Sequence, residues 1–233
     1  HATPPEFKHN PEEYVDLICN EMIPAVAEQG IPIFCDVFCE NGYFSADQSR
    51  RILTVAKENG MKLRMHADEF EDSGAAELAA EVEAISADHL MAISDAGIRA
   101  MQEQNVIATL LPGTTHFLGK EGYAPARKLI DEGITVALAT DFNPGSCRIN
   151  SMPYIISLAI DEMYMTVEEA FASATYHAAQ SLVIGSNVGS IEIGKQADLI
   201  IWEVSALKDI PNRNKSLPIR AVIKRGKVFE VSR

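Results

Sequence analysis

The side chains best suited to chemistry stand where apolar, strand-like runs of the sequence end. His66 and Glu69 lie at the end of the run MKLRMHADE, and Asp141 ends the run TVALATD of residues 135–141. A strand that is buried on both faces offers a carboxylate no solvent, so we expect Asp141 at the strand tip, where a cation or a substrate can meet it. An Asp that only caps the following turn is the alternative.

This combination of residue types suits a metal-dependent hydrolysis. The neutral imidazole of His66 is a ligand for zinc or iron, and the carboxylate of Asp141 offers a hard oxygen. Glu69 is close enough in sequence to act on a water at the metal without itself binding the ion. The structural alternatives are a hydrogen-bonded strand-end histidine for His66 and a surface loop carboxylate for Glu69.

The bulk composition limits the class of protein. The chain has 233 residues, of which 47% are hydrophobic, and its formal net charge is −13. This length is enough for one domain, or one domain with a small appendage. The charge argues against nucleic acid or a membrane surface as partner. The four cysteines form no CxxC pair, and no signal peptide or long apolar stretch is evident, so we expect reduced thiols and a cytoplasmic location.

The elements that position these residues alternate regularly. Strand-like runs alternate with helical runs at a spacing of roughly 20 to 30 residues, the pattern of serial βα units with a parallel sheet. The predicted strands are residues 33–38, 61–68, 84–87, 106–111 and 135–141, and the predicted helices are residues 11–29, 45–59, 73–81, 94–104 and 124–132. Polar residues that follow the strands form a rim, which indicates a barrel mouth: Glu40, His66, His89, Thr114 to His116 and Asp141.

The pattern changes after Asp141. Residues 150–159 and 166–184 read as helices, residues 190–204 as two strands around a Gly-Lys turn, and residues 219–231 as a hairpin around Arg225 and Gly226. We therefore predict a barrel portion with its trailing helices over residues 1–185 and a small β module over residues 186–233. His116 is expected in a Thr-rich loop.

Several long phrases resemble the imidazolonepropionase family of the amidohydrolase superfamily. The tail phrase GSIEIGKQADLIIWE is similar to the superfamily as a whole. The family resemblance is carried by HATPPEFK (1–8), FCDVFCENGYFSADQSRRIL (34–53), HADEF (66–70), ELAAEVEAISADHL (77–90), LLPGTTHFL (110–118) and ALATDFNPGSC (137–147). The phrases are ordered along essentially the whole chain.

The resemblance implies an α/β fold: a (β/α)8 TIM barrel of the metal-dependent amidohydrolase type, with about the last five βα units present, and a small C-terminal β-sandwich. It implies hydrolysis of the cyclic amide 4-imidazolone-5-propanoate to N-formimidoyl-L-glutamate in histidine degradation, with one zinc or iron ion per subunit. It further implies a small-molecule substrate and a homodimer.

The resemblance also assigns site residues. The implied metal ligands are His66 and Asp141, and the implied catalytic residues are Glu69, His89 and Asp141. The implied substrate-binding residues are His1, Glu69, Asn143, Gly145 and Ser146.

One departure from the family is large. The family also uses a His-x-His pair at the end of its first strand, and this chain contains none. We expect a fragment of a normal enzyme, with two further His ligands supplied by a preceding N-terminal part. Two alternatives stay open: another amidohydrolase, such as a cyclic-amide hydrolase or aromatic deaminase, or an inactive half-chain that acts as a partner.

Overall fold

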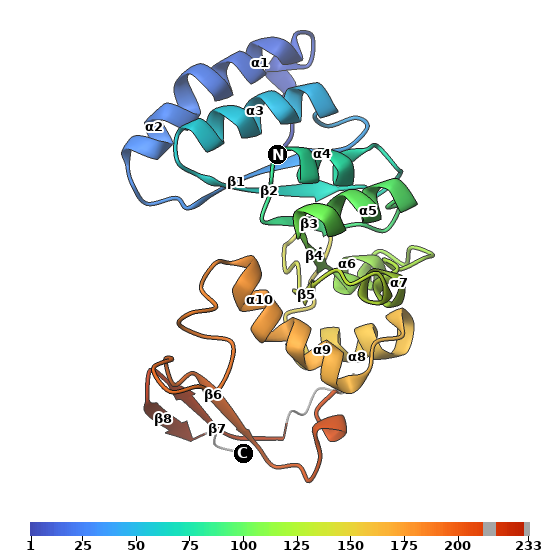
Figure 1. Ribbon diagram of the computed structural model, residues 1–233, viewed down its shortest axis with the longest axis vertical. Helices are drawn as coiled ribbons and strands as arrows, with labels where there is room; N and C mark the ends of the chain where they lie inside the picture. The colour runs from blue at the N-terminus through green and yellow to red at the C-terminus, as the bar shows by residue number, and fades with distance from the viewer. Residues whose placement is uncertain (212–217, 231–233) are drawn as a thin grey trace. The chain divides into compact units, whose positions relative to one another are not determined.

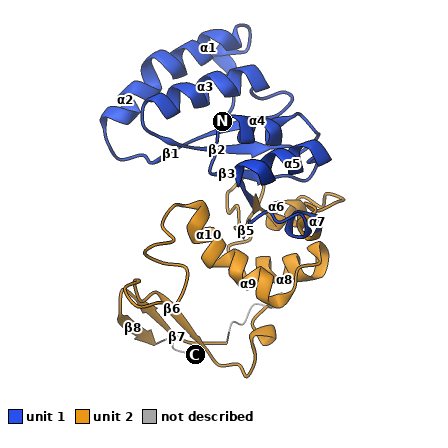
Figure 2. Cartoon of the chain, viewed as in Figure 1, with its two compact units in different colours: residues 1–108, 128–135 blue, residues 109–127, 136–233 orange. Residues whose placement is uncertain are grey.

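The computed structural model describes residues 1–211 and 218–230. The chain forms two compact units (Figure 2). The first unit comprises residues 1–108 and 128–135, and the second comprises residues 109–127 and 136–233. The predicted boundary between residues 185 and 186 does not coincide with these units and stays a prediction.

Five strands form the larger sheet, in the order β1-β2-β3-β4-β5, which is also their order along the chain. Their bounds are Phe34–Cys39 (β1), Lys62–Ala67 (β2), Ser86–His89 (β3), Ile107–Leu110 (β4) and Val136–Leu138 (β5). In the first unit, β1 pairs with β2 and β2 with β3, both in parallel. The predicted parallel sheet of βα units is therefore confirmed.

Helices connect these strands, as the sequence predicts (Figure 1). They are α1 (Pro11–Leu17), a π-helical segment (Ile18–Met22), α2 (Ile23–Glu28), α3 (Ala46–Glu58), α4 (Ala75–Glu81), α5 (Asp95–Gln104) and α7 (Ala126–Asp131). The start of α3 follows from a capping box: the Gln48 N–H donates to Ser45 Oγ (3.2 Å), and the Ser45 N–H donates to Gln48 Oε1 (3.0 Å).

The two faces of β1, β2 and β3 differ in chemistry. Successive side chains of a strand point to opposite faces. One face carries buried apolar side chains, among them Val37, Leu63, Met65, Ala67 and Ala87. The other face carries polar side chains from all three strands: Asp36, Arg64, His66, Ser86 and Asp88. We call this second side the polar face, and it carries the candidate site.

The second unit contains helices and a separate small sheet. The helices are α6 (Pro112–Phe117), α8 (Met152–Met163), α9 (Val167–Ala174) and α10 (Tyr176–Ser181). Strands β6 (Leu199–Trp202), β7 (Ile219–Lys224) and β8 (Lys227–Glu230) form an antiparallel sheet in that order. The hairpin around Arg225 and Gly226 is confirmed, and the sheet corresponds to the predicted β module.

Three local predictions are wrong. His116 lies in helix α6 and not in a loop, because Pro112 occupies the first helical turn, where its missing N–H is no loss. The helix predicted over residues 166–184 breaks at Thr175, whose backbone is not helical (φ −128°, ψ −80°). Residues 190–204 contain one strand, β6, and not two. Ile191 and Ile193 alternate as in a strand, but both are exposed and no described strand pairs with them.

Short 3₁₀ turns occur at Pro5–Phe7 and Leu207–Asp209. Among the helices in residues 1–211 and 218–230, none has the length and apolar character needed to cross a membrane.

Candidate active site

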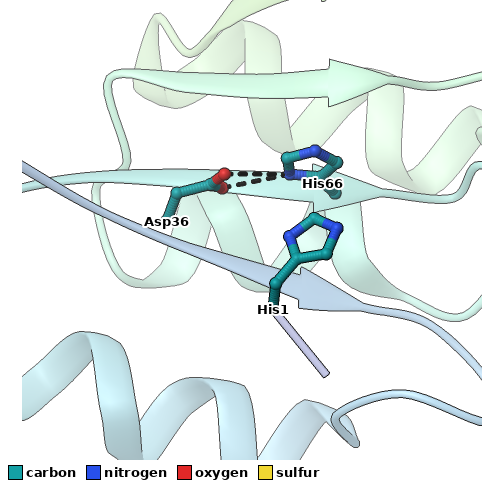
Figure 3. Close-up of side chains that lie close together, drawn as sticks. All are labelled: His1, Asp36 and His66. Atoms are coloured by element: carbon teal, nitrogen blue, oxygen red, sulfur yellow. Dashed lines mark hydrogen bonds and ion pairs between the residues drawn. The ribbon is translucent and has the colours of Figure 1, made fainter. Parts of the chain in front are cut away.

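His66 lies near the end of β2 on the polar face and meets a carboxylate of the neighbouring strand. Its Nδ1 is 3.0 and 3.2 Å from the two carboxylate oxygens of Asp36 on β1 (Figure 3). The ring of His1 packs edge-on against His66, with ring centroids 4.6 Å apart. His1 also packs against Phe38, the register partner of His66, at 5.1 Å. The two imidazoles and the carboxylate therefore gather over β1 and β2.

This cluster has the chemistry and the dimensions of a metal site. His1, Asp36 and His66 each offer one ligand atom, and all three atoms lie within 4.8 Å of one another. Imidazole nitrogen with carboxylate oxygen is a donor set that zinc and iron accept. The residues present around His66 thus fit a divalent metal ion.

Glu69 and His89 form the second part of the site. The Nε2 atom of His89 is 3.7 Å from Oε2 of Glu69, and both side chains are buried. The rings of His66 and His89 lie 5.2 Å apart. The interpretation of Glu69 as a surface loop carboxylate is therefore wrong, since only 8% of the residue is exposed. An acid–base group and an imidazole stand beside the candidate metal ligand, shielded from bulk water.

Two buried carboxylates hold the loop that carries Glu69. Oε2 of Glu40, at the end of β1, accepts the Phe70 backbone N–H at 3.0 Å. Asp68 accepts from Ser73 Oγ and from the backbone N–H groups of residues 73, 75 and 76, at 3.0 to 3.2 Å. Glu69 therefore sits between two anchored neighbours. The sequence around Asp68 shows no local capping pattern, because the groups that donate hydrogen bonds to it lie five to eight residues later in the chain.

The backbone at the strand ends is unusual. Asp68, His89 and Asp141 have positive φ angles of 47°, 76° and 51°. Such angles are rare for residues other than glycine, cost of order 1–3 kcal/mol and cluster at functional sites. At these three residues the backbone therefore leaves the extended conformation of a strand.

A largely buried ion pair lies beside the contact of Asp36 with His66 on the polar face, since Arg64 is the register partner of Asp36 and Asp88 that of His66. Nη2 of Arg64 is 3.3 Å from both carboxylate oxygens of Asp88, and Ser86 Oγ donates to Asp88 at 2.9 Å. Burial raises the pKa of the Asp88 carboxyl, and the Arg64 guanidinium opposes that rise. The sequence analysis missed Asp36 and this pair. A charged residue inside an apolar strand indicates that it has a polar partner, but the sequence does not show which residue that partner is.

Within residues 1–211 and 218–230, no cysteine belongs to a group of three side chains placed to hold a metal ion. All four are free. Burial raises the pKa of the Cys35 thiol to about 11, and the adjacent Asp36 carboxylate adds to the rise. Burial also raises the pKa of Cys19 and Cys39. A raised pKa favours the protonated thiol over the thiolate at neutral pH.

In the second unit, Asp141 lies beyond the end of β5. Thr114 Oγ1 donates a hydrogen bond to its Oδ2. Asn143 builds the turn that follows: Oδ1 accepts the N–H groups of Gly145 (2.9 Å) and Ser146 (2.7 Å), and Nδ2 donates to the Asp141 carbonyl (2.8 Å). The side chain of Asn143 is thus engaged in shaping the turn.

The predicted site residues therefore form two groups. The first unit brings together His1, His66, Glu69 and His89, and the second brings together Asp141, Asn143, Gly145 and Ser146. His66 belongs to the first unit and Asp141 to the second, and their pairing at one metal ion stays a prediction.

The match to known proteins defines the class. Residues 40–229 match the amidohydrolase family, and the chain belongs to that family. It is similar to the imidazolonepropionases of Alkaliphilus oremlandii and Geobacillus kaustophilus, with 47% and 52% identity over 228 residues. Each comparison covers 98% of this chain and 54% of the relative. The chain thus spans about half the length of the curated relatives it matches.

Solved structures agree on the fold. A zinc-bound adenosine deaminase from Xanthomonas campestris superimposes with a TM-score of 0.69 at 20% identity, covering 90% of this chain and 55% of the other. A 5-methylcytosine deaminase from Klebsiella pneumoniae gives a TM-score of 0.73 at 19% identity, covering 91% and 60%. At this identity the likeness concerns fold alone. The chain carries part of an amidohydrolase-type barrel with a small β module, as the sequence predicts.

Proposed function

We propose that the protein containing this chain hydrolyses the ring amide of 4-imidazolone-5-propanoate, giving N-formimidoyl-L-glutamate. The observation that carries this proposal is the similarity to imidazolonepropionases along 98% of the chain, at 45–52% identity. The grouping of His66, Glu69 and His89 supplies chemistry suited to the reaction.

One zinc or iron ion per subunit belongs to the proposal. His66 and Asp141 would hold it, with two further His ligands from outside this chain. The zinc-bound relative of similar fold and the donor set around His66 support a metal ion here. When bound, such an ion supplies Lewis acidity and lowers the pKa of a water molecule that it binds.

Glu69 and His89 carry the proton and charge transfers. Water adds to the imidazolone carbonyl, and the Glu69 carboxylate takes the proton that the water loses. Negative charge then develops on the carbonyl oxygen, where the imidazole of His89 stabilises it. The ring C–N bond breaks, and the proton passes to the departing nitrogen. Asp141 shares the proton-transfer role. Burial of Glu69 and His89 favours these steps, because little solvent competes for their hydrogen bonds.

The proposed substrate contacts come from both units. His1 lies beside His66 and offers a ring N–H to the substrate's polar atoms. Asn143, Gly145 and Ser146 form the turn after Asp141 that we propose holds the polar ends of the substrate. Glu69 contacts the ring as well as moving the proton.

The test uses the full-length protein. Purified protein is incubated with 4-imidazolone-5-propanoate, and formation of N-formimidoyl-L-glutamate is followed by mass spectrometry. Hydantoin and guanine serve as competing substrates, since a cyclic-amide hydrolase or an aromatic deaminase would prefer one of them. We expect turnover of imidazolone-propanoate alone. Metal content measured on the same sample separates an enzyme from an inactive half-chain, which would hold little metal.

We propose a homodimer in the cytoplasm that binds neither nucleic acid nor membranes. The net charge of −13 argues against nucleic acid and membranes as partners, because it repels anionic polymers and surfaces. Size-exclusion chromatography with light scattering tests the dimer.

A further inference from the structure

Asp36 stands out on the polar face because both of its oxygens lie near one nitrogen of His66. The distances from Nδ1 are 3.0 and 3.2 Å (Figure 3). The side chain of His66 is 19% exposed and that of Asp36 is 36% exposed. The contact is therefore partly shielded, where a charge-assisted hydrogen bond is stronger than at an open surface.

The strand register makes this contact a fixed feature of the sheet. Phe38 of β1 is the register partner of His66, and Asp36 lies two residues earlier on the same face. Both groups thus come from paired strands and not from loops. The direct register partner of Asp36 is Arg64, whose guanidinium forms an ion pair with the carboxylate of Asp88.

A carboxylate at Nδ1 determines what the other ring nitrogen can do. An imidazole that donates its Nδ1 proton keeps Nε2 unprotonated and able to bind a metal ion. Such a partner also fixes the orientation of the ring and increases its basicity. Because Asp36 lies inside a strand, the sequence pattern does not identify it as the partner of His66.

We propose that Asp36 is a positioning residue that accepts the Nδ1 proton of His66 and presents Nε2 to the metal ion. This role rests on the proposed metal site at His66. The competing role for Asp36 is direct ligation, since its carboxylate also lies within 4.8 Å of ligand atoms of both His1 and His66.

Two substitutions separate these roles in the full-length protein. Asp36→Asn keeps an oxygen that can accept the Nδ1 proton, and Asp36→Ala removes it. The readout is the dissociation constant for Zn²⁺, measured by competition with a chelator, with kcat and KM measured in parallel. Asp16→Ala is the matched control, because it removes an exposed carboxylate paired with Arg51 in the same unit.

If Asp36 positions His66, we expect Asp36→Ala to weaken Zn²⁺ binding by about 10–100-fold. We expect Asp36→Asn to weaken it by less than about a third of that factor. Asp16→Ala should leave Zn²⁺ binding unchanged. Equal losses for both Asp36 variants, of the size seen for His66→Ala, would identify a direct ligand and overturn the proposal. An unchanged dissociation constant for Asp36→Ala would overturn it as well. If the wild type binds Zn²⁺ through His66 but does not hydrolyse imidazolone-propanoate, the proposed function fails while these affinities still decide the role of Asp36.

Discussion

Asp68→Ala should destabilise the protein strongly, although Asp68 touches neither substrate nor metal in the proposed mechanism. Its carboxylate is fully buried and accepts hydrogen bonds from Ser73 and from the backbone N–H groups of Ala75 and Ala76. Ala75 and Ala76 are themselves fully buried at the start of α4. The substitution would leave their N–H groups without an acceptor.

The magnitude follows from those two donors. A buried donor left without an acceptor costs about 1–3 kcal/mol, so the pair costs about 2–6 kcal/mol. Asp68 also has a φ of 47°, and Ala tolerates this left-handed conformation less well than Asp does. We therefore expect Asp68→Ala to reduce the free energy of unfolding by about 4 kcal/mol. Asp68→Asn keeps one oxygen acceptor and the tolerance for positive φ, so it should lose about 1–2 kcal/mol.

The assay is urea unfolding of the full-length protein, followed by far-ultraviolet circular dichroism. Asp72→Ala is the matched control, because Asp72 is exposed and accepts a long hydrogen bond of 3.4 Å from the Gly74 N–H. A loss below about 1 kcal/mol for Asp68→Ala, or a loss equal to that of Asp72→Ala, would refute the reasoning. Kinetics add a second check: Asp68→Asn should lower kcat, because the neighbouring Glu69 loses part of its anchor.

Three further predictions concern chemistry, metal and pH. Glu69→Gln should lower kcat for imidazolone-propanoate by about 10²–10⁴-fold while Zn²⁺ affinity stays unchanged, because the amide cannot take a proton. Removing the metal with a chelator should lower the midpoint temperature of thermal unfolding of the wild type but not of His66→Ala. The reason is that a ligand at 100 times its Kd stabilises the native state by about 2.7 kcal/mol, and His66→Ala lacks a ligand for the ion. Lys224 and the Arg225 N–H lower the pKa of Asp198 to about 2. The stabilisation from Asp198 is therefore present above the unfolded pKa of about 3.9 and is lost as the pH falls towards 2. The difference in urea midpoint between wild type and Asp198→Asn should be larger at about pH 5 than at about pH 3.

Each of these predictions has a clear contrary result. A Glu69→Gln variant with normal kcat would remove Glu69 from the proton transfer. Equal chelator sensitivity in the wild type and His66→Ala would place the metal elsewhere. A midpoint difference that grows on acidification would show that Asp198 is not held in its charged form by Lys224.

The sequence predicted the larger sheet well, because each strand and helix has its own local signal. The capping box at Ser45 and the apolar runs of β1 to β5 are patterns of a few neighbouring residues. Asn143 is similar, since an Asn before Pro and Gly predicts a turn and the observed hydrogen bonds span two or three residues. Such features need no knowledge of the remaining chain.

The errors occurred where the outcome depends on partners distant in sequence. Residues 190–193 alternate like a strand, but a strand also needs a neighbour to pair with, which the local pattern does not supply. The Thr-rich stretch around His116 was expected to form a loop, although Pro112 before it also suits the first turn of a helix. In both cases the local signal permitted two outcomes.

The supporting residues of the site show the same division. His66, Glu69 and His89 could be found because strand ends in a parallel sheet meet at one edge. The residues that support the site, Asp36 and Glu40, could not be identified from the sequence. The contact of Asp36 with His66 and that of Glu40 with Phe70 each join residues 30 positions apart. Those contacts depend on the β1–β2 register, in which Phe38 lies opposite His66. A shift of one residue in that register would turn Asp36 to the apolar face and cost both the pair with His66 and the burial of Val37. The apolar core that selects the register therefore also selects the partner of the candidate metal ligand, so the stability of the sheet and the geometry of the site have a common cause.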